Sequence, residues 1–195
     1  NSKPNNDFTL SSGDLKSLKN FLRPDFELVE VLYDKILMSE ERSIKLTEDQ
    51  YRYVDIAMDN ERVLCSGGAG TGKTFLAAEL ARRKGAEGRE VLFVCKSPWL
   101  KNYLSTRILN DNVTISTVGG VKKSLRRAGL SSFDVLIVDE GQDLFNFDDM
   151  EVLDDSVVGG LENGEWYIFH DLNNQSDLLS VANAEVLEYL KSLNN

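Results

Sequence analysis

A glycine-rich segment at residues 67–74 carries the most specific chemistry in the sequence. It reads GGAGTGKT and fits the pattern G-x-x-x-x-G-K-[ST], with Gly67, Gly72, Lys73 and Thr74 at the fixed positions. Glycines let a backbone curl around a phosphate and direct successive N–H groups at it. In this pattern the lysine is the cation for the β- and γ-phosphates, and the hydroxyl is a magnesium ligand. The sequence therefore predicts an ATP and magnesium site formed by Gly67, Gly68, Ala69, Gly70, Thr71, Gly72, Lys73 and Thr74.

Two adjacent carboxylates could supply the second magnesium ligand and the general base that ATP hydrolysis requires beside a phosphate loop. Residues 134–140 read DVLIVDE, so four apolar residues run directly into Asp139 and Glu140. Asp139, at the end of a buried strand, is placed to hold the magnesium ion. Glu140 is placed to polarise an attacking water as a general base, which favours hydrolysis over transfer to a small-molecule acceptor. Lys73 and Glu140 are thus the predicted catalytic residues.

The segments that must position these residues alternate between two patterns. Short runs rich in β-branched residues, almost without polar interruption, are typical of parallel strands buried on both faces. They lie at 62–66, 90–95, 113–116, 134–139 and 166–170. Helical patterns separate or follow them, at 73–87, 98–109, 118–128, 148–161 and 176–193. Strand–helix alternation predicts the α/β class, with a mostly parallel sheet in three layers as in P-loop NTPases.

The first part of the chain is different. Two helical patterns before residue 38 and a charged connector at 38–46 predict a helical extension over 1–46, followed by the ATPase domain over 47–195. Thr47 opens a further predicted helix. Gln50 stands three residues after it, which is the spacing of a capping box, so a structural role for Gln50 stays open.

Residues 139–143, DEGQD, resemble the D-E-x-Q-D box of UvrD-like superfamily 1 helicases. The resemblance extends over about residues 21–180 and implies a RecA-like fold and ATP hydrolysis coupled to translocation on, or unwinding of, DNA or RNA. The segment FLRPDF at 21–26 also resembles the lead-in of the subgroup that often carries a nuclease-related (NERD) domain.

The resemblance also implies roles for further residues. Gln50 falls in a segment similar to the Q motif, whose glutamine reads adenine, and Gln175 in one similar to motif III, whose glutamine senses the γ-phosphate. Lys96 and Trp99 match motif Ia and Thr117 the following T-motif, both contact regions for single-stranded nucleic acid. The aromatic residue and histidine usual after that threonine are replaced here by Val118, Gly119 and Gly120.

The family implies a partner as well. Its motor has a second RecA-like domain that carries arginine fingers, and we expect that domain to be missing from these 195 residues. Residues 134–195 contain no arginine. Because an arginine finger contributes about 10³–10⁵ in rate in related systems, we expect the chain alone to be nearly inactive.

Charge is distributed unevenly along the chain. The net charge is -10, yet residues 60–133 carry 13 basic and 5 acidic side chains, whereas residues 134–195 carry 1 and 15. Given a motor domain, the basic excess predicts weak contacts to a nucleic-acid backbone, with Lys122 and Lys123 on a helix after the T-motif. A solvated helix surface is the alternative interpretation.

Composition excludes several other classes. The single histidine, His170, and the two cysteines, Cys65 and Cys95, are too few for a zinc site. No apolar run is long enough to span a membrane, and residues 1–10 lack the pattern of a signal peptide, so we expect a cytoplasmic protein with reduced thiols. His170 is expected to be structural. Trp99 could stack on a base or fill the space between its helix and the sheet.

Three functions remain open from the sequence. The first is the ATP-binding half of a nucleic-acid-dependent ATPase or helicase. The second is a non-catalytic module that binds ATP and signals. The third is a P-loop kinase for a small substrate, which the glutamate after Asp139 makes the weakest of the three.

Overall fold

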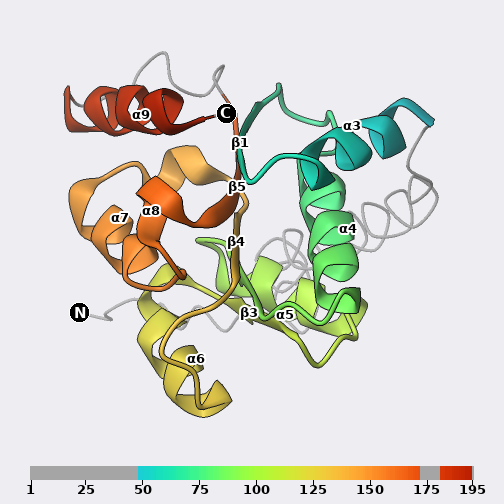
Figure 1. Cartoon of the computed structure of the whole chain (residues 1–195). Coiled ribbons are helices and arrows are strands. Elements are labelled where there is room, and N and C mark those ends of the chain that lie inside the picture. The colour runs from blue at the N-terminus through green and yellow to red at the C-terminus, as the bar shows by residue number, and fades with distance from the viewer. Residues whose placement is uncertain (1–47, 172–180, 195) are drawn as a thin grey trace, which may run out of the picture. The chain divides into compact units, whose positions relative to one another are not determined.

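A parallel sheet of five strands forms the centre of the unit Leu46–Asn195 (Figure 1). A computed structural model describes residues 48–171 and 181–194, all within the unit Leu46–Asn195. The expected extension over 1–46 lies outside the described residues. The strands lie in the order β1-β5-β4-β2-β3. Their bounds are β1 Arg62–Ser66, β2 Val91–Val94, β3 Val113–Ser116, β4 Val135–Val138 and β5 Glu165–His170.

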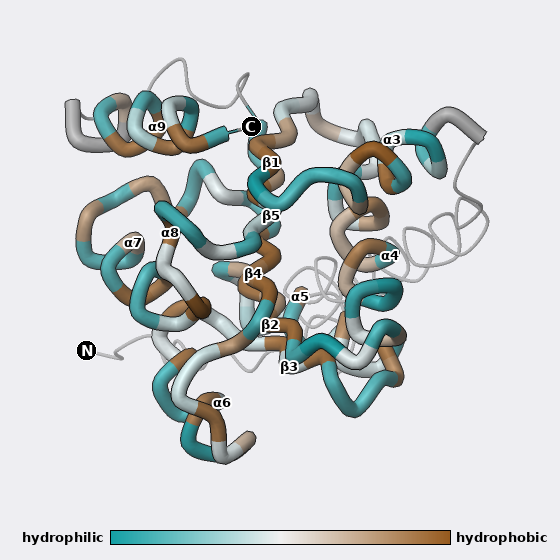
Figure 2. The backbone as a smooth tube through the Cα atoms, in the orientation of Figure 1, coloured by the Kyte–Doolittle hydropathy of each residue, from teal (hydrophilic) through white to brown (hydrophobic). Residues whose placement is uncertain are grey.

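The interior strands consist of the uninterrupted apolar runs seen in the sequence. Every residue of β2 and β4 is buried, as are all residues of β5 except Glu165. Such strands are stable only where helices cover both faces of the sheet. The hydropathy-coloured backbone in Figure 2 shows the hydrophobic residues gathered along these central strands. The parallel sheet confirms the predicted α/β class.

Helices cover both faces of the sheet and give the molecule two hydrophobic cores. On one face lie α3 (Glu48–Met58), α4 (Lys73–Ala86) and α5 (Pro98–Arg107). On the other lie α6 (Val121–Ala128), preceded by the 3₁₀ turn η1 (Val118–Gly120), and α7 (Phe147–Asp154), α8 (Gly160–Asn163) and α9 (Val181–Leu193). Figure 1 shows α3 and α4 on one side of the strands and α7, α8 and α9 on the other.

The strand order brings the predicted site residues to one edge of the sheet. β1 and β4 both pair with β5, so their carboxyl ends meet at the same edge. The phosphate loop follows β1, Asp139 follows β4 and Asp171 follows β5. In open parallel sheets, ligands bind at this edge, where the strand order reverses.

The predicted helix over 148–161 is wrong, because the chain breaks into α7 and α8. Residues between them turn back to the sheet, where Phe133 N donates to Ser156 O (2.8 Å) and Val158 N donates to Phe133 O (2.9 Å). Gly159 and Gly160 then adopt φ values of 83° and 63°, which favour glycine. The apolar spacing at 148–161 continues through this break, and so it indicated one helix.

The opposite, amino-terminal edge of the sheet is held by a buried ion pair. Lys84 Nζ lies 2.7 Å from Glu165 Oε1, and both side chains are at most 10% exposed. Arg89 Nη2 lies 2.9 Å from the other oxygen of Glu165, and the Tyr167 hydroxyl donates to Glu165 Oε1 at 2.7 Å. Burial and the Glu165 charge raise the pKa of Tyr167. This network fixes the end of α4 to the start of β5.

None of the helices in the described part of the chain is both long and apolar enough to cross a lipid bilayer.

Candidate nucleotide-binding site

The phosphate loop connects β1 to α4 and is anchored at its first residue. Gly67 N donates to His170 O at 3.1 Å, so the first residue of the loop is hydrogen-bonded to the end of the neighbouring strand β5. Gly72 precedes α4 with φ 88°, and a Cβ atom there would lie 2.5 Å from Nε2 of Gln50. Only glycine fits both constraints. Ala69, Gly70 and Thr71 are exposed at the tip of the loop, and Gly67 and Gly68 are half-buried.

Lys73, the first residue of α4, folds back over the loop. Its Nζ donates to Gly67 O (2.8 Å) and Gly68 O (3.0 Å), and lies 3.9 Å from Oδ2 of Asp171. The side chain is 7% exposed. The closest partners of the Lys73 ammonium group are therefore neutral carbonyl groups of the predicted phosphate loop.

The predicted magnesium ligands are in direct contact. Thr74 Oγ1 donates to Asp139 Oδ2 at 2.7 Å, although the two residues are 65 positions apart. Burial raises the pKa of Asp139 to about 6, and the Glu140 charge adds to this, whereas the Thr74 hydrogen bond opposes it. Among the described residues no cation lies at bonding distance from this buried carboxylate, and a hard, oxygen-preferring cation fits such a position. Magnesium is usually bound by one or two carboxylates together with substrate phosphates. The Asp139 carboxylate and the Thr74 hydroxyl are suitable oxygen donors for such a site.

Glu140 has an unusual backbone conformation. With φ 54° it is the one non-glycine residue of positive φ in the described part of the chain. Its carboxylate accepts a hydrogen bond from Gln142 Nε2 at 2.6 Å. Gln142 Oε1 in turn accepts from the backbone N–H of Asp171 at 2.9 Å. Gln142 thus connects the predicted general base to the end of β5.

Gln50 lies beside the loop on α3. Its Nε2 donates to Thr71 O at 3.2 Å. This contact places Gln50 beside the predicted phosphate loop and gives it a structural contact there, and the adenine-reading role stays a prediction. Thr47, its partner in the alternative capping box, lies outside the described residues. Gln175 lies outside them as well.

The residues predicted to contact nucleic acid follow β2 and β3, which pair with each other. Lys96 is exposed and donates to Asp143 O at 3.3 Å, next to the acidic box. Thr117 is half-buried before η1, and Lys122 and Lys123 are exposed on α6. Lys96 and Thr117 thus follow the carboxyl ends of adjacent strands, and Lys122 and Lys123 lie farther along the chain on α6.

Trp99 does not fill the space between α5 and the sheet. It is 48% exposed and stacks on Tyr103, with ring centroids 5.6 Å apart. Leu100 and Leu104 pack toward the sheet instead. The arrangement leaves an aromatic surface open to solvent.

Two residues at the site were not assigned a role from the sequence. Asp171 is 2% exposed and faces Lys73, and Gln142 holds Glu140. Asp171 directly follows a buried strand, as Asp139 does, and this position in the sequence could have indicated that Asp171 belongs to the site. His170, expected to be structural, is buried in β5 against Phe145, and its Nδ1 has no hydrogen-bond partner among the described residues. Burial lowers the pKa of His170.

Comparison with known proteins places the chain in a family. A family model described as an AAA domain matches residues 45–154. The ATP-dependent DNA helicase PIF1 of Trypanosoma brucei brucei (strain 927/4 GUTat10.1) is 29% identical over 116 residues. That alignment covers 60% of this chain and 12% of the relative, so this chain spans a small part of its length.

The fold also has a solved counterpart. The crystal structure of a hypothetical ATP-dependent RNA helicase from Sulfolobus tokodaii matches with a TM-score of 0.55 at 16% sequence identity. The match covers 83% of this chain and 56% of that one. At this identity the likeness concerns the fold.

The family match spans the strand before the phosphate loop, the loop itself and the acidic box, which are the segments that the geometry brings together. The chain belongs to the AAA domain family, and its parallel sheet has the fold of a RecA-like P-loop domain.

Proposed function

We propose that this chain is the ATP-binding half of a nucleic-acid-dependent ATPase that translocates on, or unwinds, DNA or RNA. The observation that carries the proposal is the 2.7 Å contact between Thr74 and Asp139, with Glu140 beside it. The relatives support it, because one is named a DNA helicase and the structural counterpart an RNA helicase. They do not favour one nucleic acid over the other.

In this proposal, Thr74 and Asp139 would hold a magnesium ion, which would neutralise the negative charge of the ATP phosphates. Lys73 moves from the carbonyl groups of the loop to the β- and γ-phosphate oxygens. Glu140 accepts the proton of the attacking water, whose oxygen bonds to the γ-phosphorus while the bond to the bridging oxygen breaks. Gln142 keeps the Glu140 carboxylate in position during this step.

A second RecA-like domain supplies the arginine in this proposal. The absence of arginine from residues 134–195 supports it, as does the small share of the PIF1 relative that the chain covers. The single-stranded track lies over Lys96, Trp99, Thr117, Lys122 and Lys123. The exposed Trp99–Tyr103 stack supports this, because aromatic faces suit unpaired bases of any sequence.

The finer assignments are part of the same proposal. The box DEGQD supports a UvrD-like protein, and the segment FLRPDF at 21–26 supports the subgroup that often carries a NERD domain. The proposal includes a helical extension over 1–46 and the ATPase domain over 47–195. The free cysteines Cys65 and Cys95 support a cytoplasmic location, because reduced thiols persist there.

The test compares ATP turnover by the chain alone with turnover by a longer protein that includes the second domain, with and without single-stranded DNA or RNA. We expect about 10³-fold faster turnover in the longer protein, and further stimulation by one of the two nucleic acids. Glu140→Gln is the matched control, because it should keep ATP binding and lose turnover.

Two results would contradict the proposal. Fast turnover by the monomeric chain would show that no outside arginine is needed. Tight ATP binding without turnover in the longer protein, at any nucleic-acid concentration, would favour the non-catalytic module instead.

A further inference from the structure

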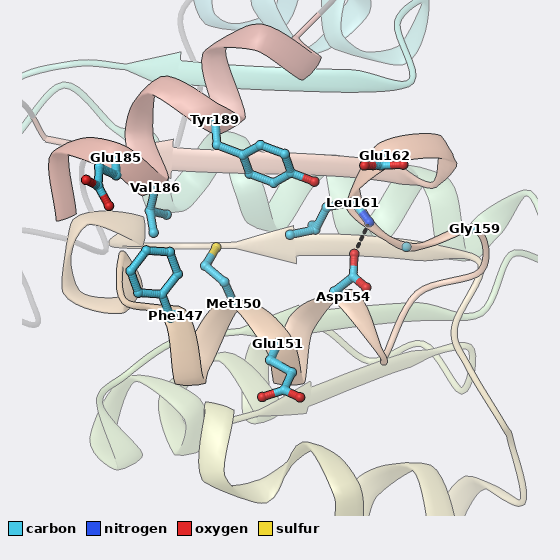
Figure 3. Close-up of a pocket in the computed structure, with 11 residues that line it drawn as sticks. Phe147, Met150, Glu151, Asp154, Gly159, Leu161, Glu162, Glu185, Val186 and Tyr189 are labelled. Atoms are coloured by element: carbon cyan, nitrogen blue, oxygen red, sulfur yellow. Dashed lines mark hydrogen bonds between the residues drawn. The ribbon is translucent and has the colours of Figure 1, made fainter. Parts of the chain in front are cut away.

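A groove away from the nucleotide site lies between α7, α8 and α9. It has a volume of about 710 Å³ (Figure 3). Its floor is apolar and buried, formed by Met150, Leu161 and Val186. Two aromatic side chains border it while remaining open to solvent: Phe147 is 60% exposed and Tyr189 is 42% exposed. Exposed aromatics beside a concave apolar floor are typical of a surface that receives a partner.

The rim of this groove is acidic. Four carboxylates line it, those of Glu151, Asp154, Glu162 and Glu185. In Figure 3, Glu185 stands at one end of the groove and Glu162 at the other. Burial raises the pKa of Tyr189, and the charges of Glu162 and Asp154 act in the same direction. These two carboxylates therefore act electrostatically on a side chain that borders the groove.

The described residues of this rim include no cation, whereas other acidic residues have cationic partners. Glu165 pairs with Lys84 and Arg89, and Glu79 pairs with Arg82 and Arg83. Among the described residues that line the groove there is no lysine or arginine. Lys191, the one basic residue of the segment 134–195, pairs with Glu188 outside the groove. The negative charge of the rim is therefore available to a cationic partner.

We propose that the groove between α7 and α9 binds a basic amphipathic helix of a separate partner protein. Large apolar side chains on one face of that helix enter the groove and contact Phe147 and Tyr189. Lysine and arginine side chains at its margins lie against Glu162 and Glu185. An amphipathic helix in a hydrophobic groove is a common recognition mode, in which apolar anchors recur every three or four residues.

Helix α6 of a second copy, a basic helix in the described part of the chain, fits the groove less well. It carries Lys122, Lys123, Arg126 and Arg127, but the apolar side chains Val121 and Leu125 pack into its own core. α6 would bring charge without an apolar anchor. A partner helix with a free apolar face satisfies both features of the groove.

The test uses a synthetic amphipathic peptide of about five helical turns, with leucine on one face and lysine and arginine on the other. Its binding to the full chain is measured by fluorescence anisotropy at low and at physiological salt. A peptide of the same composition in scrambled order controls for charge alone. We expect the amphipathic peptide to bind at least tenfold more tightly than the scrambled one.

Two variants locate the binding. Phe147→Ala removes an exposed anchor without changing charge and should weaken binding about fivefold to tenfold. Glu185→Lys should weaken it by a similar factor. The matched control is Glu87→Lys, which makes the same charge change at an exposed position after α4, and it should have little effect.

Several outcomes would overturn the proposal. Equal binding of the two peptides, or equal loss in Glu87→Lys and Glu185→Lys, would reduce the effect to net charge. No binding at low salt would remove the groove as a docking site. A dimer in sedimentation that Phe147→Ala converts to monomer would assign the groove to a second copy. The inference is independent of the proposed function, since Lys73→Met should bind the peptide as the unmodified chain does.

Discussion

The two ends of α4 each carry a buried lysine, and the two lysines have opposite environments. Lys84 is 6% exposed and pairs with the Glu165 carboxylate at 2.7 Å. Lys73 is 7% exposed, but its closest partners are the carbonyl oxygens of Gly67 and Gly68. The charge of Lys84 is satisfied within the fold. Lys73 can leave its carbonyl groups for a phosphate without leaving a closely bonded carboxylate unpaired.

The same contrast applies to the carboxylates. Glu165, at the amino-terminal edge of the sheet, has two cationic partners and a tyrosine. Asp139, at the carboxyl edge, is fully buried, and it accepts hydrogen bonds from the Thr74 hydroxyl and from the backbone N–H of Glu140. At the amino-terminal edge the Glu165 charge is thus balanced by cations of the fold. At the carboxyl edge the Asp139 charge would be balanced by a bound ligand.

The largest expected effect comes from removing the Lys84–Glu165 ion pair at the amino-terminal edge of the sheet. Lys84→Met should lower the free energy of unfolding by about 3 kcal/mol, because it leaves the Glu165 carboxylate buried with less compensation. ATP affinity should stay within twofold. Urea unfolding followed by circular dichroism measures the first quantity, and calorimetric titration the second. Lys73→Met is the control, with an unfolding free energy within about 1 kcal/mol of the unmodified chain. Equal destabilisation by the two variants would remove the distinction between the edges.

The opposite effect is expected at Asp139. Its folded pKa of about 6 exceeds the ordinary value of 3.8, so the folded chain holds this proton more tightly than the unfolded chain. Between those two pH values, stability should therefore fall as pH rises. Asp139→Asn should raise the unfolding free energy by about 2 kcal/mol at pH 7.5 and by little below pH 4, since each pKa unit corresponds to about 1.4 kcal/mol.

The same variant should lose the magnesium dependence of ATP binding. In the unmodified chain, magnesium-dependent affinity should decline as the pH falls below about 6, because protonated Asp139 cannot bind the cation. Titrations with ATP at several pH values, with magnesium or EDTA, provide the measurement. If Asp139→Asn is destabilised at pH 7.5, the carboxylate is stabilised by partners other than those described.

Lys73→Met should next reduce ATP affinity about tenfold or more, through the loss of charge-assisted hydrogen bonds to the phosphates. Adenosine is the informative control ligand. Its affinity should not change, because it has no phosphate for Lys73 to contact. Equal ATP affinity in the variant would show that the loop does not hold the phosphates.

The smallest effect is expected on nucleic acid. We expect weak, salt-sensitive binding in the range of about 10⁻⁴–10⁻⁶ M. Reversing the charge of Lys122 and Lys123 to glutamate should weaken it several-fold and flatten the salt dependence. Lys191→Glu, on the acidic side of the sequence, should leave it unchanged. Anisotropy of a labelled oligonucleotide across a salt series decides between these outcomes.

The carboxyl edge of the sheet was predictable from the sequence because its signals are local. The phosphate loop is a fixed pattern, and Asp139 directly follows an apolar run. The strand bounds agreed to within a residue for the same reason. Sheet order then brought Thr74 and Asp139 together, as the prediction of a shared magnesium site required.

The amino-terminal edge was not predictable in this way. Lys84 and Glu165 are 81 residues apart and belong to no pattern, so their pairing emerges only when α4 packs on β5. The groove beside α7 depends on the break at Gly159 and Gly160, where the apolar period misled the prediction. Contacts set by packing rather than by spacing are the ones a single sequence conceals.

The left-handed backbone of Glu140 has a consequence for protein engineering. A side chain in this conformation costs about 1 kcal/mol or more, which asparagine or glycine would partly relieve. A stability-guided redesign would therefore choose Glu140→Asn and, by the argument from burial, Asp139→Asn as its first improvements. The resulting protein would be more stable, but it would lack the proposed magnesium ligand and the proposed general base. Any thermostabilised version of this domain should be selected with these two positions held fixed.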